Sequence, residues 1–271
     1  AAFPPPDSLV VNGLAIATLI FYAIIGVSEV TGLHLQYSKF WNLDTSTSTS
    51  SRDKRSKLPK KRRKIVLSSR AGMLLFYAPA FLAALAFFWL FPGGGLRSLM
   101  VESALALHFF KRIIEVLFVH KYSGGTAVVS TIIISSGYLS VTCLLLYAQT
   151  LTRQLPEPPL DLKLLGFALF LVGIFGNFYH HYLLASLRKN GEKGYKIPSG
   201  GLFGLVICPH YLFEIVGFFG ISFISQTLCG FSVALGVVVY LTSRSYVTRK
   251  WYVAKFEDFP AHVKALVPFV Y

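Results

Sequence analysis

The feature that most constrains this chain is a series of long apolar runs, because about 20 successive apolar residues suffice to cross a bilayer as a helix. Only 14% of its 271 residues are charged, against about 25% in a typical soluble domain. Lipid offers no hydrogen bonds to the backbone, which favours helices for such runs. The sequence therefore predicts an all-α, polytopic membrane protein with seven transmembrane helices, at about 9–33, 71–91, 98–120, 127–150, 162–187, 205–225 and 228–243.

Charge divides the chain and predicts its orientation. A basic, Ser/Thr-rich segment at 44–70, with a composition that favours disorder, separates an N-terminal span (1–43) from a membrane domain (71–271). Positive charge also gathers in the loop after Arg188 and in the tail from Arg244. By the positive-inside rule these segments, and the C-terminus, face the cytosol. A basic face on anionic lipid accounts for the net charge of +14, so we expect no nucleic-acid partner.

Three cysteines lie in or beside apolar runs without regular spacing: Cys143, Cys208 and Cys229. Metal sites and disulfide frameworks both show recognisable cysteine spacings. We therefore expect neither a disulfide framework nor a metal site in this chain.

Polar side chains line one face near the end of the fifth run. If the helix continues through 188, then Asn177, His181 and Arg188 fall within roughly 40° of one another. Lys189 and a glycine-rich loop at 194–201 follow. Arginine forks onto phosphate oxygens, and glycine lets backbone approach a ligand closely. The pattern favours a phosphate-bearing ligand, and the alternative is an ordinary helix end with interfacial cations. A Rossmann site is excluded, because G-x-G-x-x-G and strand–helix alternation are missing from the sequence.

A second polar stripe lies inside the third run. His108, Lys111, Arg112 and Glu115 fall on one helical face within roughly 100°. Each charged group facing lipid costs about 2.5–3.5 kcal/mol on insertion scales. These side chains therefore face either one another, as an internal ion-pair stripe, or a substrate cavity. Glu214 is a carboxylate in the sixth run, and for the same reason it must face either an ion-pair partner or a cavity.

Four motifs near the C-terminus carry a family resemblance: LRKNGEKGYKIPSGGLF at 187–203, CPHYLFE at 208–214, KFEDFP at 255–260 and KALVPFVY at 264–271. They resemble the steroid 5-alpha-reductase family, which also includes very-long-chain enoyl-CoA reductases and polyprenol reductases. The resemblance implies a multi-pass enzyme of the endoplasmic-reticulum membrane that uses NADPH to reduce a carbon–carbon double bond in a lipid. It also implies that the helices enclose a cavity for cofactor and substrate.

The resemblance implies particular site residues by position. The cofactor contacts it implies are Asn177, His181, Arg188, Tyr195, Lys196, His210, Glu214, Arg244 and Tyr252. Three of these depart from the steroid enzymes, which usually have Asp at His181, Arg at Lys196 and Asn at His210. The pair Phe76-Tyr77 replaces a Gln-Glu pair whose Glu helps to polarise the 3-oxo group of a steroid, and Phe109 replaces a Tyr.

Three side chains are catalytic candidates: Tyr211, Lys111 and Tyr77. Tyr211 is placed to protonate the substrate after hydride arrives, and a Tyr or Lys is suited to stabilise an enolate. We expect a 3-oxo-4-ene steroid as substrate. A trans-2-enoyl thioester stands nearly level, since HFFKRIIEVLFVHKYSGGT at 108–126 looks closer to the enoyl-CoA reductases, and polyprenol is third. A membrane methyltransferase that binds S-adenosylmethionine and a catalytically silent binding protein are the alternatives.

Overall fold

The computed structural model describes residues 2–33, 65–122, 124–188 and 194–271. Most of the predicted basic linker at 44–70 lies outside these residues. So do the last ten residues of the predicted N-terminal region and Lys189, which precedes the glycine-rich loop.

Helices occupy all seven predicted places. Their bounds are α1 Leu9–Val30, α3 Ser69–Leu90, α4 Gly95–Ile114, α5 Val128–Thr150, α6 Lys163–Ser186, α7 Pro209–Ser225 and α8 Leu228–Lys255. Among the described residues, five are long and apolar enough to cross a membrane, namely α1, α3, α5, α6 and α8. The apolar α7 has only 17 residues, and α4 carries charged side chains along its length. That α4 and α7 also cross stays a prediction.

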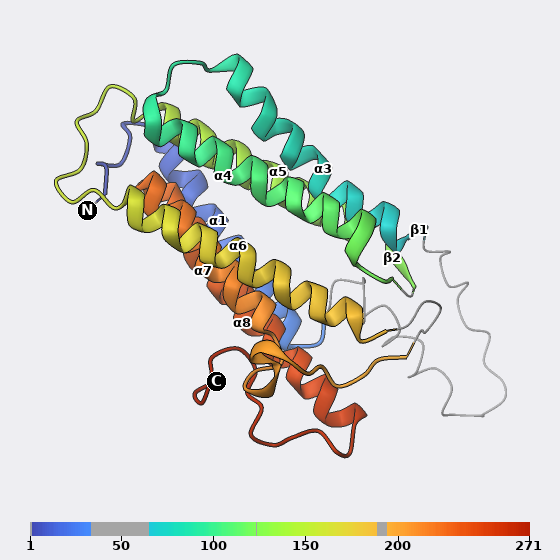
Figure 1. Cartoon of the computed structure of the whole chain (residues 1–271). Coiled ribbons are helices and arrows are strands. Elements are labelled where there is room, and N and C mark those ends of the chain that lie inside the picture. The colour runs from blue at the N-terminus through green and yellow to red at the C-terminus, as the bar shows by residue number, and fades with distance from the viewer. Residues whose placement is uncertain (1, 34–64, 123, 189–193) are drawn as a thin grey trace.

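The helices run side by side in an elongated bundle (Figure 1), with α3, α4 and α5 grouped together and α6, α7 and α8 grouped beside them. Helix α1 packs along α8. The outer surface is apolar: Trp89, Phe118 and Phe175 are 87%, 77% and 69% exposed. So much exposed aromatic surface is unfavourable in water and suits contact with lipid.

Helices α6 and α7 approach each other closely through glycines. A Cβ on Gly173 would lie 2.4 Å from the backbone nitrogen of Gly217, and a Cβ on Gly166 would lie 2.6 Å from the carbonyl oxygen of Gly220. Small residues at these positions let two helix backbones pack together in a membrane. The contact fixes α6 and α7 as one unit, which carries many of the predicted site residues.

At one end of the bundle, Arg97 fastens three connections together. Its guanidinium donates to the carbonyl oxygen of Ile224 at 2.5 Å, to the Gln226 side chain at 2.9 Å and to Asp161 Oδ1 at 2.7 Å, and it also pairs with Glu157. Hydrogen bonds from Lys163, together with the Arg97 charge, lower the pKa of Asp161 to about 2. The carboxylate therefore stays ionised, and this clasp intact, at neutral pH.

The opposite end gathers the segments at 66–70, 115–122, 124–127 and 194–208 and the C-terminal tail. Strand β1 (Val66–Ser68) pairs antiparallel with β2 (Gly125–Ala127). The Lys264 carbonyl oxygen accepts from the Ile207 amide at 2.9 Å, so the tail folds back onto the start of α7. The described part of the loop, at 194–201, and the tail therefore share one end, as the charge pattern predicts.

The structure corrects three details. The small sheet departs from an all-α fold, and β1 lies where the linker was expected. Helix α7 begins at Pro209 rather than 205, since Gly200 and Gly201 have positive φ angles and residues 201–204 form a 3₁₀ turn. Helix α8 runs to Lys255 rather than 243, because buried partners accommodate its polar residues, so Arg244 and Tyr252 lie on a helix and not in a tail.

Candidate functional site

A pocket of about 740 Å³ runs along the inside of the bundle, bordered by all seven helices. On α8 its lining extends from Val237 to Tyr252, which at 1.5 Å per residue is roughly 22 Å along the helix. On α1 the lining residues are Leu14, Ala17, Thr18, Phe21, Tyr22 and Ile25, the spacing of a single helical face. The N-terminal helix is therefore part of the pocket wall.

Most of the predicted site residues line this pocket. They are Tyr77, His181, Arg188, Tyr195, Lys196, His210, Tyr211, Glu214, Arg244 and Tyr252. The two that do not are Lys111 and Asn177. The fold thus brings together side chains from α3, α6, α7, α8 and the loop at 194–201.

The end of the pocket near Arg188 and the 194–201 loop is cationic. Arg188, Lys121 and Lys196 all line it. The Arg188 guanidinium lies over the Tyr195 ring, 4.7 Å from its centroid, and its Nη1 donates to the Lys121 carbonyl oxygen at 3.2 Å. Lys121 in turn donates to the Arg188 carbonyl oxygen. These contacts hold two cations side by side at the mouth, which suits a phosphate-bearing ligand.

Asn177 and Lys111 lie behind the wall and support it. The Lys111 ammonium contacts Asn177 Oδ1 and lies 3.1 Å from Glu115 Oε1. The Asn177 amide donates to the His210 carbonyl oxygen at 2.7 Å and to Glu214 Oε2 at 3.4 Å. These contacts turn Lys111 away from the pocket, where we expected a catalytic group, and they fix the first turn of α7.

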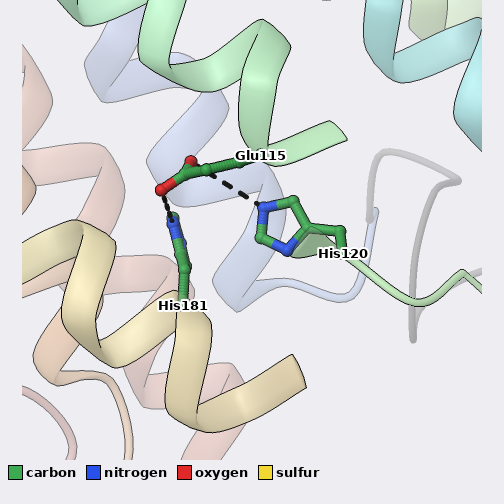
Figure 2. Close-up of side chains that lie close together, drawn as sticks. All are labelled: Glu115, His120 and His181. Carbon is green, nitrogen blue, oxygen red and sulfur yellow. Dashed lines mark hydrogen bonds and ion pairs between the residues drawn. The ribbon is translucent and has the colours of Figure 1, made fainter. Parts of the chain in front are cut away.

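Glu115 is the centre of a buried cluster (Figure 2). Its carboxylate is inaccessible to solvent, pairs with Arg112 at 2.9 Å, accepts from His181 Nδ1 at 3.0 Å and lies 3.9 Å from His120 Nε2. Residues Glu115–Val119 form a π-helical turn. In a regular α-helix His120 would lie about 140° away from Glu115 around the axis, whereas the wider turn brings it back beside the cluster.

The same cluster offers potential metal ligands. Ligand atoms of Glu115, His120 and His181 lie within 4.8 Å of one another. However, the Lys111 ammonium and the Arg112 guanidinium already pair with both carboxylate oxygens. Two positive charges at this distance repel a further cation, so the arrangement favours an ion-pair network over a metal site.

Arg112 connects this cluster to the pocket. Its Nη2 donates to the Tyr77 hydroxyl oxygen at 2.5 Å, and both side chains line the pocket. The sequence left open whether the polar stripe forms an internal ion-pair network or faces a cavity. Arg112 does both, because it pairs with Glu115 and also lines the pocket. His108 instead packs against the rings of Phe109 and Phe218.

Arg244 is held from the N-terminal helix. Its Nη1 donates to Glu29 Oε2 at 2.5 Å, and both side chains are almost fully buried. Thr248 and Tyr252 follow at four-residue spacing on α8, so all three face the pocket. Sequence reasoning missed this role of α1, although a carboxylate inside an apolar run was the available signal.

Four further lining residues also escaped sequence reasoning: His120, Lys121, Tyr122 and Tyr138. The π turn and the β1–β2 pairing position the first three, and neither has a recognisable local signal. Within the described residues, the buried Tyr122 hydroxyl and Thr248 Oγ1 have no hydrogen-bond partner. Buried polar atoms usually have a hydrogen-bond partner, either a protein group or an ordered water. Both of these atoms belong to residues that line the pocket.

Comparison with known proteins gives a consistent result. The sequence profile of the family described as 3-oxo-5-alpha-steroid 4-dehydrogenase matches residues 126–271. A steroid 5-alpha-reductase of Gossypium hirsutum is 32% identical over 198 residues, which cover 68% of this chain and 76% of that protein.

Two other relatives match over shorter stretches. The 3-oxo-5-alpha-steroid 4-dehydrogenase 1 of Rattus norvegicus is 45% identical over 107 residues, covering 40% of this chain and 41% of the relative. A very-long-chain enoyl-CoA reductase of Dictyostelium discoideum is 32% identical over 167 residues, covering 61% of this chain and 55% of the relative. With the motifs and the pocket they build, these matches establish that the chain belongs to the steroid 5-alpha-reductase family of oxidoreductases.

Proposed function

We propose that this protein uses NADPH to reduce a carbon–carbon double bond conjugated to a carbonyl group in a membrane lipid, with a 3-oxo-4-ene steroid as the first candidate. The observation that carries the proposal is one pocket that joins a cationic mouth to an apolar interior in a member of this family. We also propose that the mouth faces the cytosol from the endoplasmic-reticulum membrane, where a soluble cofactor can reach it.

The residues at the mouth fit a dinucleotide phosphate. Arg188, Lys121 and Lys196 supply positive charge, and guanidinium groups bind phosphate oxygens through two parallel hydrogen bonds. Tyr195 and Tyr252 offer aromatic faces, and the unpartnered Thr248 hydroxyl offers a donor. Deeper in the pocket, Glu214 and Arg244 would hold the nicotinamide half. NADPH, when bound, supplies the hydride for the β-carbon of the alkene.

The interior of the pocket fits an apolar substrate. The faces of α1 and α5 supply Phe21, Ile25, Ile132 and Ile133. An apolar wall excludes water, which strengthens every polar contact inside it. When the alkene accepts hydride, its electron pair moves to the carbonyl oxygen, and a proton then returns to the α-carbon. Tyr211, on the same face of α7 as Glu214, is the candidate donor of that proton.

The cofactor assignment is tested by NADPH binding to the detergent-purified protein. We expect Arg188→Ala and Glu214→Ala each to weaken binding about 10- to 100-fold, the loss of one charge-assisted contact. Arg153→Ala is the matched control, because this arginine lies at the opposite end and bonds the carbonyl oxygens of Phe91 and Pro92. Unchanged affinity in both pocket variants would overturn the placement of the cofactor.

The substrate is tested by product analysis on a panel of 3-oxo-4-ene steroids, trans-2-enoyl thioesters and polyprenols. The enoyl thioester is the second candidate, because the Dictyostelium enoyl-CoA reductase matches over 167 residues. Saturable NADPH binding without turnover of any panel member would favour a silent binding protein. Turnover that needs S-adenosylmethionine instead of NADPH would favour a methyltransferase.

A further inference from the structure

We propose that Tyr77 and Arg112 act as one unit, in which Arg112 is a positioning residue that presents the Tyr77 hydroxyl to the carbonyl oxygen of the substrate. This inference rests on the proposed function and adds the group that recognises the substrate. It also narrows the substrate to a conjugated ketone or thioester, because an allylic alcohol such as polyprenol has no carbonyl oxygen to accept this hydrogen bond.

The direction of the hydrogen bond is the first argument. A guanidinium carries donors only, so Arg112 Nη2 donates and the Tyr77 oxygen accepts, at 2.5 Å. The hydroxyl hydrogen is therefore directed away from Arg112. The Arg112 carbon Cζ also lies 4.7 Å from the centroid of the Tyr77 ring. The guanidinium thus contacts both the hydroxyl and the ring, which restricts the phenol to a narrow range of orientations.

Arg112 is itself firmly held. Its Nη1 donates to Glu115 Oε2 at 2.9 Å, and Glu115 is fixed by Lys111 and His181. The three elements that meet here are α4, the π turn and α6. A catalytic geometry needs supporting residues with locked side chains, and this network supplies them.

Charge is the second argument. The Arg112 guanidinium, which also pairs with Glu115 at 2.9 Å, places a positive charge directly against the Tyr77 hydroxyl. Reduction of a conjugated alkene places negative charge on the carbonyl oxygen, and a fixed donor in a dry site stabilises that charge. A hydroxyl that accepts from a cation is polarised and donates more strongly to a third group.

Near this pair, the sequence departs from the steroid enzymes at two positions. Tyr77 and Phe109 occupy places where the steroid enzymes resembled by this chain have Glu and Tyr. Phe109 packs edge-on against the Tyr138 ring and has no polar atom to offer. The phenol and its polarising partner therefore come from Tyr77 and Arg112, on α3 and α4, and the chain keeps a hydrogen-bond donor for a carbonyl despite both departures.

Kinetics test the coupling of the two residues. The variants are Tyr77→Phe, Arg112→Lys and the double variant, with Tyr147→Phe, on the exposed face of α5, and Arg153→Lys as matched controls. We expect Tyr77→Phe to lower kcat about 100-fold, the loss of one fixed donor, and Arg112→Lys to lower it by a smaller factor, with KM and NADPH affinity nearly unchanged in both. Because Arg112 acts through Tyr77, the double variant should be no slower than Tyr77→Phe alone. Independent, multiplicative losses would overturn the proposal.

A spectroscopic measurement keeps this test separate from the proposed function. The infrared stretch of an isotope-labelled carbonyl in a bound enone should shift to lower frequency in the unmodified protein. It should return toward the apolar-solvent value in Tyr77→Phe and lie between the two in Arg112→Lys. A shift without turnover would support this inference and refute the reductase function. Turnover without a Tyr77-dependent shift would refute this inference alone, and failure to bind any conjugated carbonyl would refute both.

Discussion

At the scale of single residues, the buried charged side chains in this apolar bundle are stabilised by partners of opposite charge. Glu29 and Arg244 are almost fully buried and bonded at 2.5 Å, and Glu115 is surrounded by four partners. Removing one member of such a pair takes from the other buried charge its ion-pair partner, which is far more costly than losing an exposed pair.

Glu29→Ala is therefore expected to destabilise the protein by about 3–5 kcal/mol. Glu157→Ala is the control, because its side chain is 55% exposed and Arg97 keeps Asp161 as a partner. That change should cost at most about 1 kcal/mol. Thermal unfolding in detergent measures both, and equal shifts in Tm would contradict the burial argument.

At the scale of elements, two local features decide what reaches the pocket. The π turn at Glu115–Val119 brings His120 back beside Glu115. The glycines of α6 and α7 bring those helices close enough for Asn177 to bond the first turn of α7. Both are features of the backbone, and both determine where side chains of the site lie.

Gly173→Ala tests the second feature. The added Cβ would lie 2.4 Å from the Gly217 nitrogen, so the backbones must separate, at a cost of about 1–3 kcal/mol or more. Gly13→Ala is the control, because nothing lies within 4 Å of a Cβ there, and alanine in a helix should add about 0.5–1 kcal/mol of stability. A lower Tm for Gly173→Ala beside an unchanged or higher Tm for Gly13→Ala is expected. A lower Tm in both variants would indicate a general intolerance of alanine.

At the scale of the whole molecule, the bundle has two chemically distinct ends. The Arg97 clasp closes one end, and the cationic mouth, the small sheet and the folded-back tail lie at the other. The positive-inside rule predicts that the cationic end faces the cytosol.

Cysteine labelling of sealed microsomes tests this orientation in a Cys143→Ser background. Both probe positions are exposed, Pro156 in the loop after α5 and Glu257 after α8. A membrane-impermeant maleimide should react with Glu257→Cys directly and with Pro156→Cys only after the membrane is permeabilised. The reverse pattern would place the pocket mouth in the lumen and remove the cytosolic cofactor supply.

The sequence by itself determined the helices and the family. Apolar runs of bilayer length and four C-terminal motifs are local features, so they can be seen without a fold. Ten of the twelve site residues predicted from the sequence, from Tyr77 to Tyr252, line one pocket, and their roles stay predictions. The apolar pattern did not predict the full length of α8, because buried partners accommodate the polar residues of its second half. It also did not predict the late start of α7, which follows from the positive φ angles of Gly200 and Gly201.

Only the tertiary structure decided which charged groups face the pocket. Lys111 and Arg112 are neighbours in the sequence and equally suited to catalysis by type. Asn177 and Glu115 hold Lys111 behind the wall, whereas Arg112 reaches Tyr77. The contribution of α1 arises in the same way, through Glu29 and a residue 215 positions away. A side chain's direction depends on its partners, and here those partners come from distant segments that meet only when the helices pack.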